Sequence, residues 1–329
     1  MYILYCHPSY DRKGGTLRPI ARLLSHFYDV ELRLYKGEKR GAYLGHNTLD
    51  HRVISKKMRR VVFVGGARPG DHGIPRKWKW NKVDHVVFIS HFFRNIAKSR
   101  YKIRRSSVIH LIGGTPSDEK MVPVKPFVKS FNEIDEINFM ICAKWNKRYF
   151  KRYMRHINLF NDIIQECYPN SKLHVLGKKI TGEKAESGNI ILYRKDFHGS
   201  TSFDVYNKSD IQLILTPFDT GPMTVNESMH YRVPFICGNN SAAQEFIDMV
   251  DGVCGDVVKI DPQIRTAKHC NKYQPMVNKK FYGRKLNDDL IMKSVHNIVK
   301  NYAKYVSWRW TDEFNYEVQA KKWMNILFG

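Results

Sequence analysis

Two carboxylates eight positions apart are the residues of this sequence whose type and spacing most suggest chemistry. Asp219 follows an apolar run and precedes a turn with Gly221, and Glu227 falls about one turn into a helix expected to begin near Met223–Thr224. Backbone N–H groups at a helix start can hold a phosphate or a sugar hydroxyl. Glu227 suits the vicinal hydroxyls of a ribose, and Asp219 suits those of a second sugar. The plainer alternative is that Asp219 caps the helix and Glu227 is a solvated acid.

Several motifs that bind nucleotides or metals are absent from the sequence. No Gly-x-Gly-x-x-Gly follows a predicted strand and no Walker-type Gly-x-x-x-x-Gly-Lys-Ser/Thr occurs. The motifs His-Glu-x-x-His, Gly-x-Ser-x-Gly and Asp-x-Asp are missing too. The 6 cysteines are scattered without a Cys-x-x-Cys pair, which predicts neither a disulfide framework nor a zinc site. We therefore expect no metal and no bound cofactor.

Length and composition indicate the class of protein that carries this site. The chain has 329 residues, 43% of them hydrophobic and 13% aromatic, which suffices for two domain cores and excludes disordered and fibrous classes. No window approaches the ~20 apolar residues of a membrane span, and the first residues lack a signal-peptide pattern. The expectation is a soluble cytoplasmic protein, with peripheral attachment to a membrane left open.

Apolar runs alternate with helical patterns along nearly the whole chain, which predicts parallel sheets covered by helices. Strands are expected at residues 2–5, 30–35, 61–64, 86–89 and 108–112, and then at 137–143, 172–176, 190–193, 211–216 and 234–237. Helices are expected at 17–27, 153–167, 225–230 and 242–249, with a last one from 311 to 327.

The pattern restarts after a proline-spaced stretch, so we predict two similar α/β halves. Residues 1–125 form a short, strongly basic first domain, residues 126–310 a second domain, and 311–329 a C-terminal helix. Ligands of open parallel sheets bind beyond the carboxyl ends of the strands, so the cleft between the halves is the expected site.

The segment from 217 to 245 resembles the signature of retaining glycosyltransferases of the GT-B fold, family 4-like (glycosyl transferases group 1). Asp219 and Glu227 match its two acids, Met229 its Met, residues 234–236 its short strand, and Glu245 its final acid. The resemblance implies two Rossmann-like domains facing a central cleft and a C-terminal helix that crosses back to the first domain. Asp219 stands in place of the family's Glu, and a proline follows Gly221 where the family has glycine.

By this resemblance the protein is a nucleotide-sugar-dependent hexosyl- or pentosyltransferase that retains anomeric configuration without a metal. Asp219 would contact the donor sugar and Glu227 the nucleotide ribose, with the surrounding turn completing the donor site through Thr220, Gly221, Met223 and Thr224. In FMICAKWNKRYFKRY the resemblance places Lys144 and Lys151 on the donor diphosphate, with Arg148 and Arg152 as competing candidates. Two cations there stabilise the charge that grows as the glycosidic bond breaks.

The resemblance extends over most of the chain. Gly14-Gly15 resembles a glycine loop facing the cleft, where the backbone can approach a phosphate or sugar. Residues 84–95 resemble the last strand of the first domain with its continuation, and Ser307-Trp308 the pair that opens the C-terminal helix. His72 occupies a loop where some family members place a histidine near the donor sugar.

The acceptor has to be inferred from charge. The formal net charge is +24, and residues 51–105 carry sixteen Lys and Arg against two acids. Cations interleaved with aromatics suit nucleic acid, through phosphate neutralisation and base stacking, and also suit an anionic membrane face. The expected polyanion-binding residues are Arg76, Lys77, Trp78, Lys79, Trp80, Arg94, Lys98, Arg100, Arg104 and Arg105.

Three functions remain open at this stage. DNA with modified bases is slightly favoured as the acceptor, in which case the target base must be flipped out of the helix. The alternative is a cell-surface glycan or lipid-linked acceptor at an anionic membrane. A second alternative, from another class, is a catalytically degenerate GT-B protein that only binds. No obligate protein partner is expected.

Overall fold

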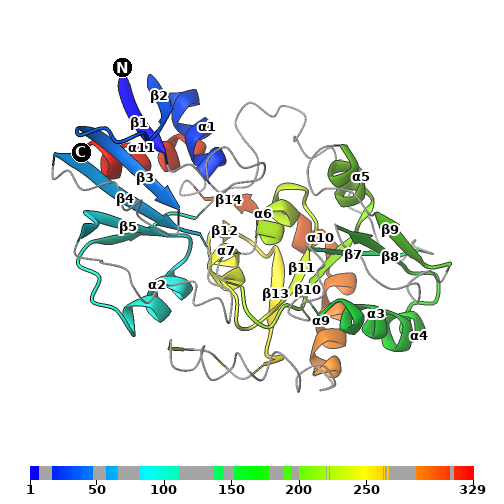
Figure 1. Cartoon of the computed structure of the whole chain (residues 1–329). Coiled ribbons are helices and arrows are strands. Elements are labelled where there is room, and N and C mark those ends of the chain that lie inside the picture. The colour runs from blue at the N-terminus through cyan, green and yellow to red at the C-terminus, as the bar shows by residue number, and fades with distance from the viewer. Residues whose placement is uncertain are drawn as a thin grey trace.

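The computed structural model describes residues 1–6, 17–46, 57–65, 82–110, 136–143, 152–177, 188–193, 200–219, 221, 223–261, 263, 265–266, 287–311 and 315–329. Within these ranges the chain forms two six-stranded sheets, and the ladders within each run parallel. Figure 1 shows them side by side, the blue and cyan sheet to the left of the green and yellow one. We call the first sheet and its helices the N-terminal domain and the second the C-terminal domain.

The N-terminal domain has the strand order β2-β1-β3-β4-β5-β6. Its strands are β1 (Tyr2–Cys6), β2 (Val30–Leu34), β3 (Gly41–His46), β4 (Met58–Val64), β5 (His85–Phe88) and β6 (Ser106–Val108), and its helices are α1 (Leu17–Phe27) and α2 (His91–Lys98). The central strand β4 ends in four apolar, buried residues (61–64), as a strand covered on both faces requires. Helix α2 is capped by Ser90, whose hydroxyl accepts from the N–H of Phe93 at 3.1 Å.

The C-terminal domain has the order β13-β11-β10-β7-β8-β9. Its strands are β7 (Asn138–Cys142), β8 (Lys172–Leu176), β9 (Ile190–Tyr193), β10 (Ile211–Ile214), β11 (Phe235–Gly238) and β13 (Gly255–Val258), and β12 (Val250–Asp251) pairs with β14 (Arg309–Trp310) outside the sheet. Its helices are α3 (Tyr153–Leu159), a π-helical stretch (Phe160–Ile164), α4 (Gln165–Cys167), α5 (Ser200–Lys208), α6 (Met223–His230), α7 (Ala243–Ile247), α9 (Asp288–Lys300) and α10 (Tyr302–Val306).

The last helix, α11 (Tyr316–Phe328), returns to the N-terminal domain. Trp323, Met324 and Leu327 are buried in the core of the first sheet, and the backbone carbonyl of Ile326 accepts from Arg59 Nε of β4 at 3.1 Å. Figure 1 shows the red α11 among the blue elements of that domain. The predicted crossing back is therefore confirmed.

Some predicted boundaries were wrong. The C-terminal helix begins at Tyr316 rather than 311, because the Asn315 side chain caps it by accepting from the N–H of Glu317 at 2.8 Å. Ser307-Trp308 does not open it: this pair lies between α10 and β14, and Trp308 is buried against the second domain. The domain boundary expected at 125/126 lies outside the described residues.

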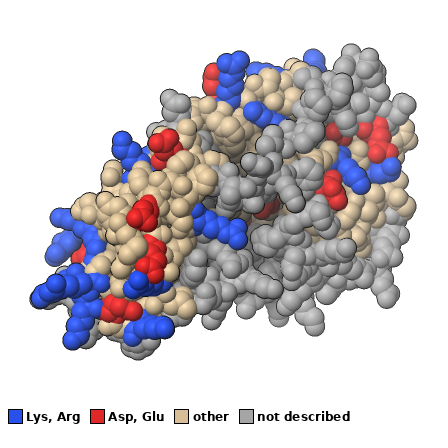
Figure 2. All heavy atoms as spheres, turned by 90° about the horizontal axis from the view of Figure 1, so that it is seen from above, with Lys and Arg blue, Asp and Glu red and all other residues tan. Residues whose placement is uncertain are grey.

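Charge is unevenly spread over the surface. Viewed from above, Lys and Arg side chains gather at the left end of the molecule, which the N-terminal domain forms, with a few acidic side chains among them (Figure 2). None of the described helices has both the length and the apolar character needed to cross a bilayer.

Candidate functional site

The carboxyl edge of the second sheet holds the first predicted acid. Asp219 follows β10, and its N–H donates to the carbonyl of Asn240 at 2.9 Å while its own carbonyl accepts from the N–H of Ala242 at 3.1 Å. Its Oδ1 accepts from the N–H of Gly221 at 3.2 Å. The loop after β10 is thereby tied to the loop after β11, and Asp219 is fixed at the edge where parallel sheets bind ligands.

Gly221 is where this loop meets the other domain. A Cβ at this position would lie 2.5–2.9 Å from three side-chain atoms of Ile89, a buried residue at the end of β5. Only glycine allows the backbone to pass so close to the first sheet. In this structure Gly221 therefore lies at the contact between the two domains.

Glu227 lies on α6, the helix whose first residue, Met223, packs against the core of the N-terminal domain. Its Oε2 accepts from the Tyr206 hydroxyl of α5 at 2.8 Å. The residue keeps some exposed surface, but burial of its carboxyl group raises the pKa to about 7, and the Tyr206 hydrogen bond opposes that rise. The second predicted acid is thus neither fully solvated nor fixed as a permanent charge.

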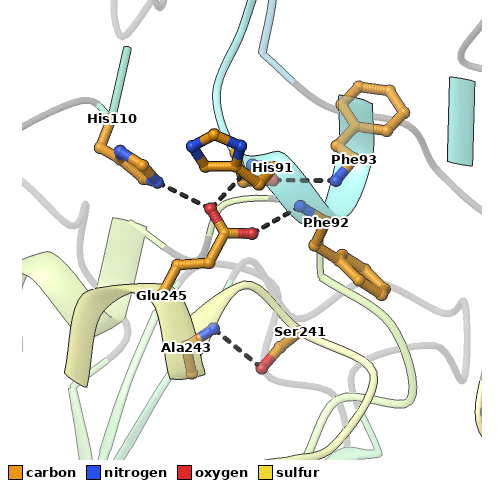
Figure 3. Close-up of polar contacts among 8 residues, drawn as sticks. His91, Phe92, Phe93, His110, Ser241, Ala243 and Glu245 are labelled. Atoms are coloured by element: carbon orange, nitrogen blue, oxygen red, sulfur yellow. Dashed lines mark hydrogen bonds and ion pairs between the residues drawn. The ribbon is translucent and has the colours of Figure 1, made fainter. Parts of the chain in front are cut away.

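Glu245, on α7, joins the two domains through three hydrogen bonds. One carboxylate oxygen accepts from the N–H of Phe92 at 2.5 Å, and the other from the N–H of His91 at 2.7 Å and from His110 Nε2 at 2.8 Å. Figure 3 shows the side chain reaching from α7 to the first turn of α2, with His110 on the other side. A carboxylate at a helix N-terminus meets both orphan donors and the positive end of the dipole.

The electrostatics of Glu245 follow from these contacts. Burial would raise its pKa, but the hydrogen bonds from His110, Phe92 and His91 outweigh burial and hold the pKa below its ordinary value. Apolar contacts accompany it: Phe92 lies 5.6 Å from Phe218, ring centroid to centroid, and Met223 of α6 packs against the N-terminal core. The carboxyl edges of both sheets therefore face each other at this contact.

Arg152, one of the competing candidates for the donor diphosphate, forms an ion pair within its own domain. Its Nη2 donates to Asp261 Oδ1 at 2.6 Å and its Nη1 to the carbonyl of Leu215 at 3.3 Å, both in buried surroundings. The ion pair ties the start of α3 to the segment after β13. These contacts hold the guanidinium in place at the carboxyl edge of the second sheet.

The described part of the predicted polyanion site lies on the far side of the first sheet. Lys98, Arg100, Arg104 and Arg105 are exposed, and they sit between the end of α2 and the start of β6. Since α2 runs back from its contact with Glu245 over about 12 Å, this basic run lies at the amino edge of the sheet. Arg94, on α2 itself, is half-buried.

The remaining predicted residues lie outside the described ranges, and their roles stay predictions: Gly14, Gly15, His72, Arg76, Lys77, Trp78, Lys79, Trp80, Lys144, Arg148, Lys151 and Thr220. Of the described ones, Asp219, Gly221, Met223, Thr224 and Glu227 fall on one loop and the helix that follows it. In the part of the chain that the structure describes, no three His, Cys, Asp or Glu side chains are grouped to hold a metal ion.

Two contacts of the candidate site were not predicted from the sequence. Tyr206 contacts Glu227 from 21 positions away, and His110 contacts Glu245 from 135 positions away. No local spacing signals such pairs; the resemblance marked Glu245 as an acid of the signature without giving its partner.

Comparison with known proteins identifies solved structures that share this fold. No family model matches the sequence and no curated protein matches it. A glycosyltransferase from Rickettsia africae superposes with a TM-score of 0.57 at 11% identity, covering 99% of this chain and 97% of that one. WaaG, a glycosyltransferase involved in lipopolysaccharide biosynthesis, gives 0.56 at 13% identity with 100% of each chain covered.

Sucrose-phosphate synthase from Thermosynechococcus elongatus gives a TM-score of 0.57 at 8% identity, with 99% of this chain and 96% of that one covered. At such identities the similarity defines the fold alone. The predicted GT-B architecture, with two Rossmann-like domains, is confirmed over the length of the chain.

Proposed function

We propose that this protein is a glycosyltransferase that moves a sugar from a nucleotide diphosphate sugar to an anionic acceptor. The observation that carries the proposal is the position of Asp219 and Glu227. Both belong to the loop and helix after β10, at the carboxyl edge of the second sheet, where that edge meets the first sheet. The whole-chain likeness to glycosyltransferases of the same fold supports it.

In the proposed reaction, Glu227 accepts hydrogen bonds from the ribose hydroxyls of the donor and Asp219 holds hydroxyls of the transferred sugar. Lys144 and Lys151, assigned by sequence resemblance, neutralise the departing diphosphate as the anomeric bond breaks. Enclosure between the domains keeps water from the activated sugar. We further propose that the anomeric configuration is retained and that no metal takes part.

The first test is incubation of the full chain with a panel of UDP-, GDP- and ADP-sugars, with and without EDTA. Slow release of the nucleoside diphosphate from one donor, unaffected by EDTA, is the expected result, because protein cations rather than a metal carry the leaving-group charge. Mass spectrometry and high-pressure chromatography measure it, and anomeric proton couplings of the product report retention. A strict metal requirement or an inverted product would contradict those parts of the proposal; binding without any turnover would favour the degenerate binding protein.

The acceptor is proposed from charge. The exposed cations between α2 and β6 lie at the amino edge of the first sheet, so they are suited to an extended anionic partner that reaches beyond the cleft. Duplex DNA with modified bases meets this description, and we retain it as the proposed acceptor. An anionic glycolipid surface is the second candidate, favoured by the fold similarity to a protein of lipopolysaccharide biosynthesis.

Neutralising this basic run is expected to weaken acceptor binding without affecting donor hydrolysis. The variant replaces Lys98, Arg100, Arg104 and Arg105 with Gln, and its matched control replaces the exposed lysines 259, 293, 300 and 304 of the C-terminal domain. Each lost phosphate contact should reduce the slope of log affinity against log salt by about 1 for duplex DNA. Titrations against duplex DNA and against phosphatidylglycerol vesicles over a salt series measure it. Binding to vesicles alone would replace DNA by the membrane acceptor, and equal effects of both variants would show non-specific charge attraction.

A further inference from the structure

A buried tyrosine forms a hydrogen bond with the predicted ribose-binding acid. The Tyr206 hydroxyl donates to Glu227 Oε2 at 2.8 Å, and the tyrosine side chain is fully buried. Its ring stacks on Tyr231 with centroids 4.8 Å apart and planes 14° from parallel. A stacked, buried ring has little freedom, so the direction of its hydroxyl is fixed by packing.

The hydroxyl is also held from its other side. Gln212 Nε2, on β10, donates to the Tyr206 oxygen at 3.4 Å, and Gln212 Oε1 accepts from the hydroxyl of Ser228, the residue after Glu227. With its oxygen accepting from Gln212, the phenol is left to donate its proton to Glu227. Burial raises the pKa of Tyr206 well above its ordinary value, so the phenol keeps that proton through the working pH range.

We propose that Tyr206 is a positioning residue for the donor site: it holds Oε2 of Glu227 and thereby presents Oε1 to the ligand's hydroxyls. The identity of that ligand, a ribose, rests on the proposed function. Among the described residues Tyr206 is the one that hydrogen-bonds the carboxyl group of Glu227, and it does so through Oε2, which leaves Oε1 for the ligand.

The titratable groups around this pair come from three elements. Tyr206 projects from α5, Cys142 from β7 faces Tyr206, and Tyr231 follows α6; the thiol and both phenols are buried. No described Lys or Arg affects the pKa of Glu227, which burial raises and the Tyr206 hydroxyl lowers. Removing that hydroxyl should therefore push the pKa of Glu227 further up and leave its carboxyl group free to rotate.

The variant Tyr206→Phe removes only the hydroxyl and keeps the stacked ring. Binding of UDP, GDP and ADP to the full chain is measured by calorimetry from pH 6 to 9, using whichever diphosphate the wild type binds. We expect a loss of about tenfold at pH 7, the size of one hydrogen bond to a charged group, and a smaller loss at pH 9, where Glu227 is ionised in both proteins. Tyr305→Phe is the matched control, because this buried tyrosine donates to Asp256 at 2.8 Å away from the site.

The pH profile separates positioning from a merely structural role. A structural defect would weaken binding equally at every pH or lower the stability of both Phe variants alike, and would overturn the proposal. The pKa of Glu227 itself, followed by carbon NMR of labelled glutamate, gives a readout that needs no ligand: an unchanged value in Tyr206→Phe also overturns it. A wild type that binds no nucleoside diphosphate refutes the proposed function instead, while a raised Glu227 pKa in the variant would still uphold the control of Glu227 by Tyr206.

Discussion

Replacing Glu227 with Gln should lower the affinity for the donor nucleotide by about a hundredfold, the largest effect that we expect at the site. The carboxylate provides charged acceptors for two ribose hydroxyls, and hydrogen bonds to a charged group contribute about 1.5–3 kcal/mol each. An amide in the same position keeps one acceptor without the charge and turns an N–H₂ group toward Tyr206 or the ligand. Calorimetric titration of the preferred nucleoside diphosphate at pH 8, where Glu227 of the wild type is mostly ionised, measures the loss.

Loss of binding in Glu227→Gln should not come from unfolding. Burial raises the pKa of Glu227 from its ordinary 4.5 to about 7, so the folded protein holds this proton more tightly than the unfolded chain does. The contribution of Glu227 to the free energy of unfolding is therefore greatest at low pH and falls as the pH rises from 4.5 to 7, by roughly 3 kcal/mol at most. The Gln variant lacks this decline.

Denaturant unfolding at pH 5 and pH 8 tests whether the contribution of Glu227 to the free energy of unfolding falls as the pH rises. We expect the variant to gain stability relative to wild type between the two values, and to be at least as stable at pH 8. Glu317→Gln, an exposed acid on α11, is the control and should change neither binding nor its pH dependence. A Glu227→Gln protein that is fully stable and binds the nucleotide as the wild type does would remove the donor site from this edge of the sheet.

Local patterns predicted most of the strands because parallel strands read as short apolar runs. The strand β3 (Gly41–His46) was not predicted, since its glycines at 41 and 45 flank only three residues and the segment looks like a turn. It nevertheless pairs with β1 and β4 at the centre of the first sheet, where hydrogen bonds to both neighbouring strands hold it in place. Strand formation there depends on tertiary context more than on propensity.

For the candidate site, too, local features could be predicted from the sequence and long-range contacts could not. The loop and helix that carry Asp219 and Glu227 are contiguous, so their spacing was visible in the sequence. The partners that set their chemistry come from distant segments, as Tyr206 does for Glu227 and His110 for Glu245. The basic run at 98–105 shows a further limit: its charge was evident from the sequence, but only the direction of α2 places it at the edge away from the contact between the domains.

Glu245 gives the second large effect, on the association of the two domains. Glu245→Ala leaves the N–H groups of His91 and Phe92 and the buried His110 ring without their shared acceptor. The N–H of Phe92 is half-buried and the His110 ring is buried, so leaving these donors without an acceptor should cost about 1–3 kcal/mol. Because the three donors belong to the N-terminal domain and the acceptor to the C-terminal domain, we expect the domains to separate more readily before either core unfolds.

Hydrogen exchange at the His91 and Phe92 amides, followed by mass spectrometry of the α2 peptide, reports this opening directly, and small-angle scattering reports the radius of gyration. Gln244→Ala is the matched control: Gln244 precedes Glu245 on α7, and its exposed side chain donates to Asp248 of the same domain at 2.8 Å. Glu245→Gln should resemble the alanine variant, since an amide group brings N–H donors toward backbone N–H donors. Unchanged exchange at α2 in both Glu245 variants would show that the apolar contacts of Gly221 with Ile89 and of Phe92 with Phe218 suffice to hold the domains together, and that the carboxylate adds little to them.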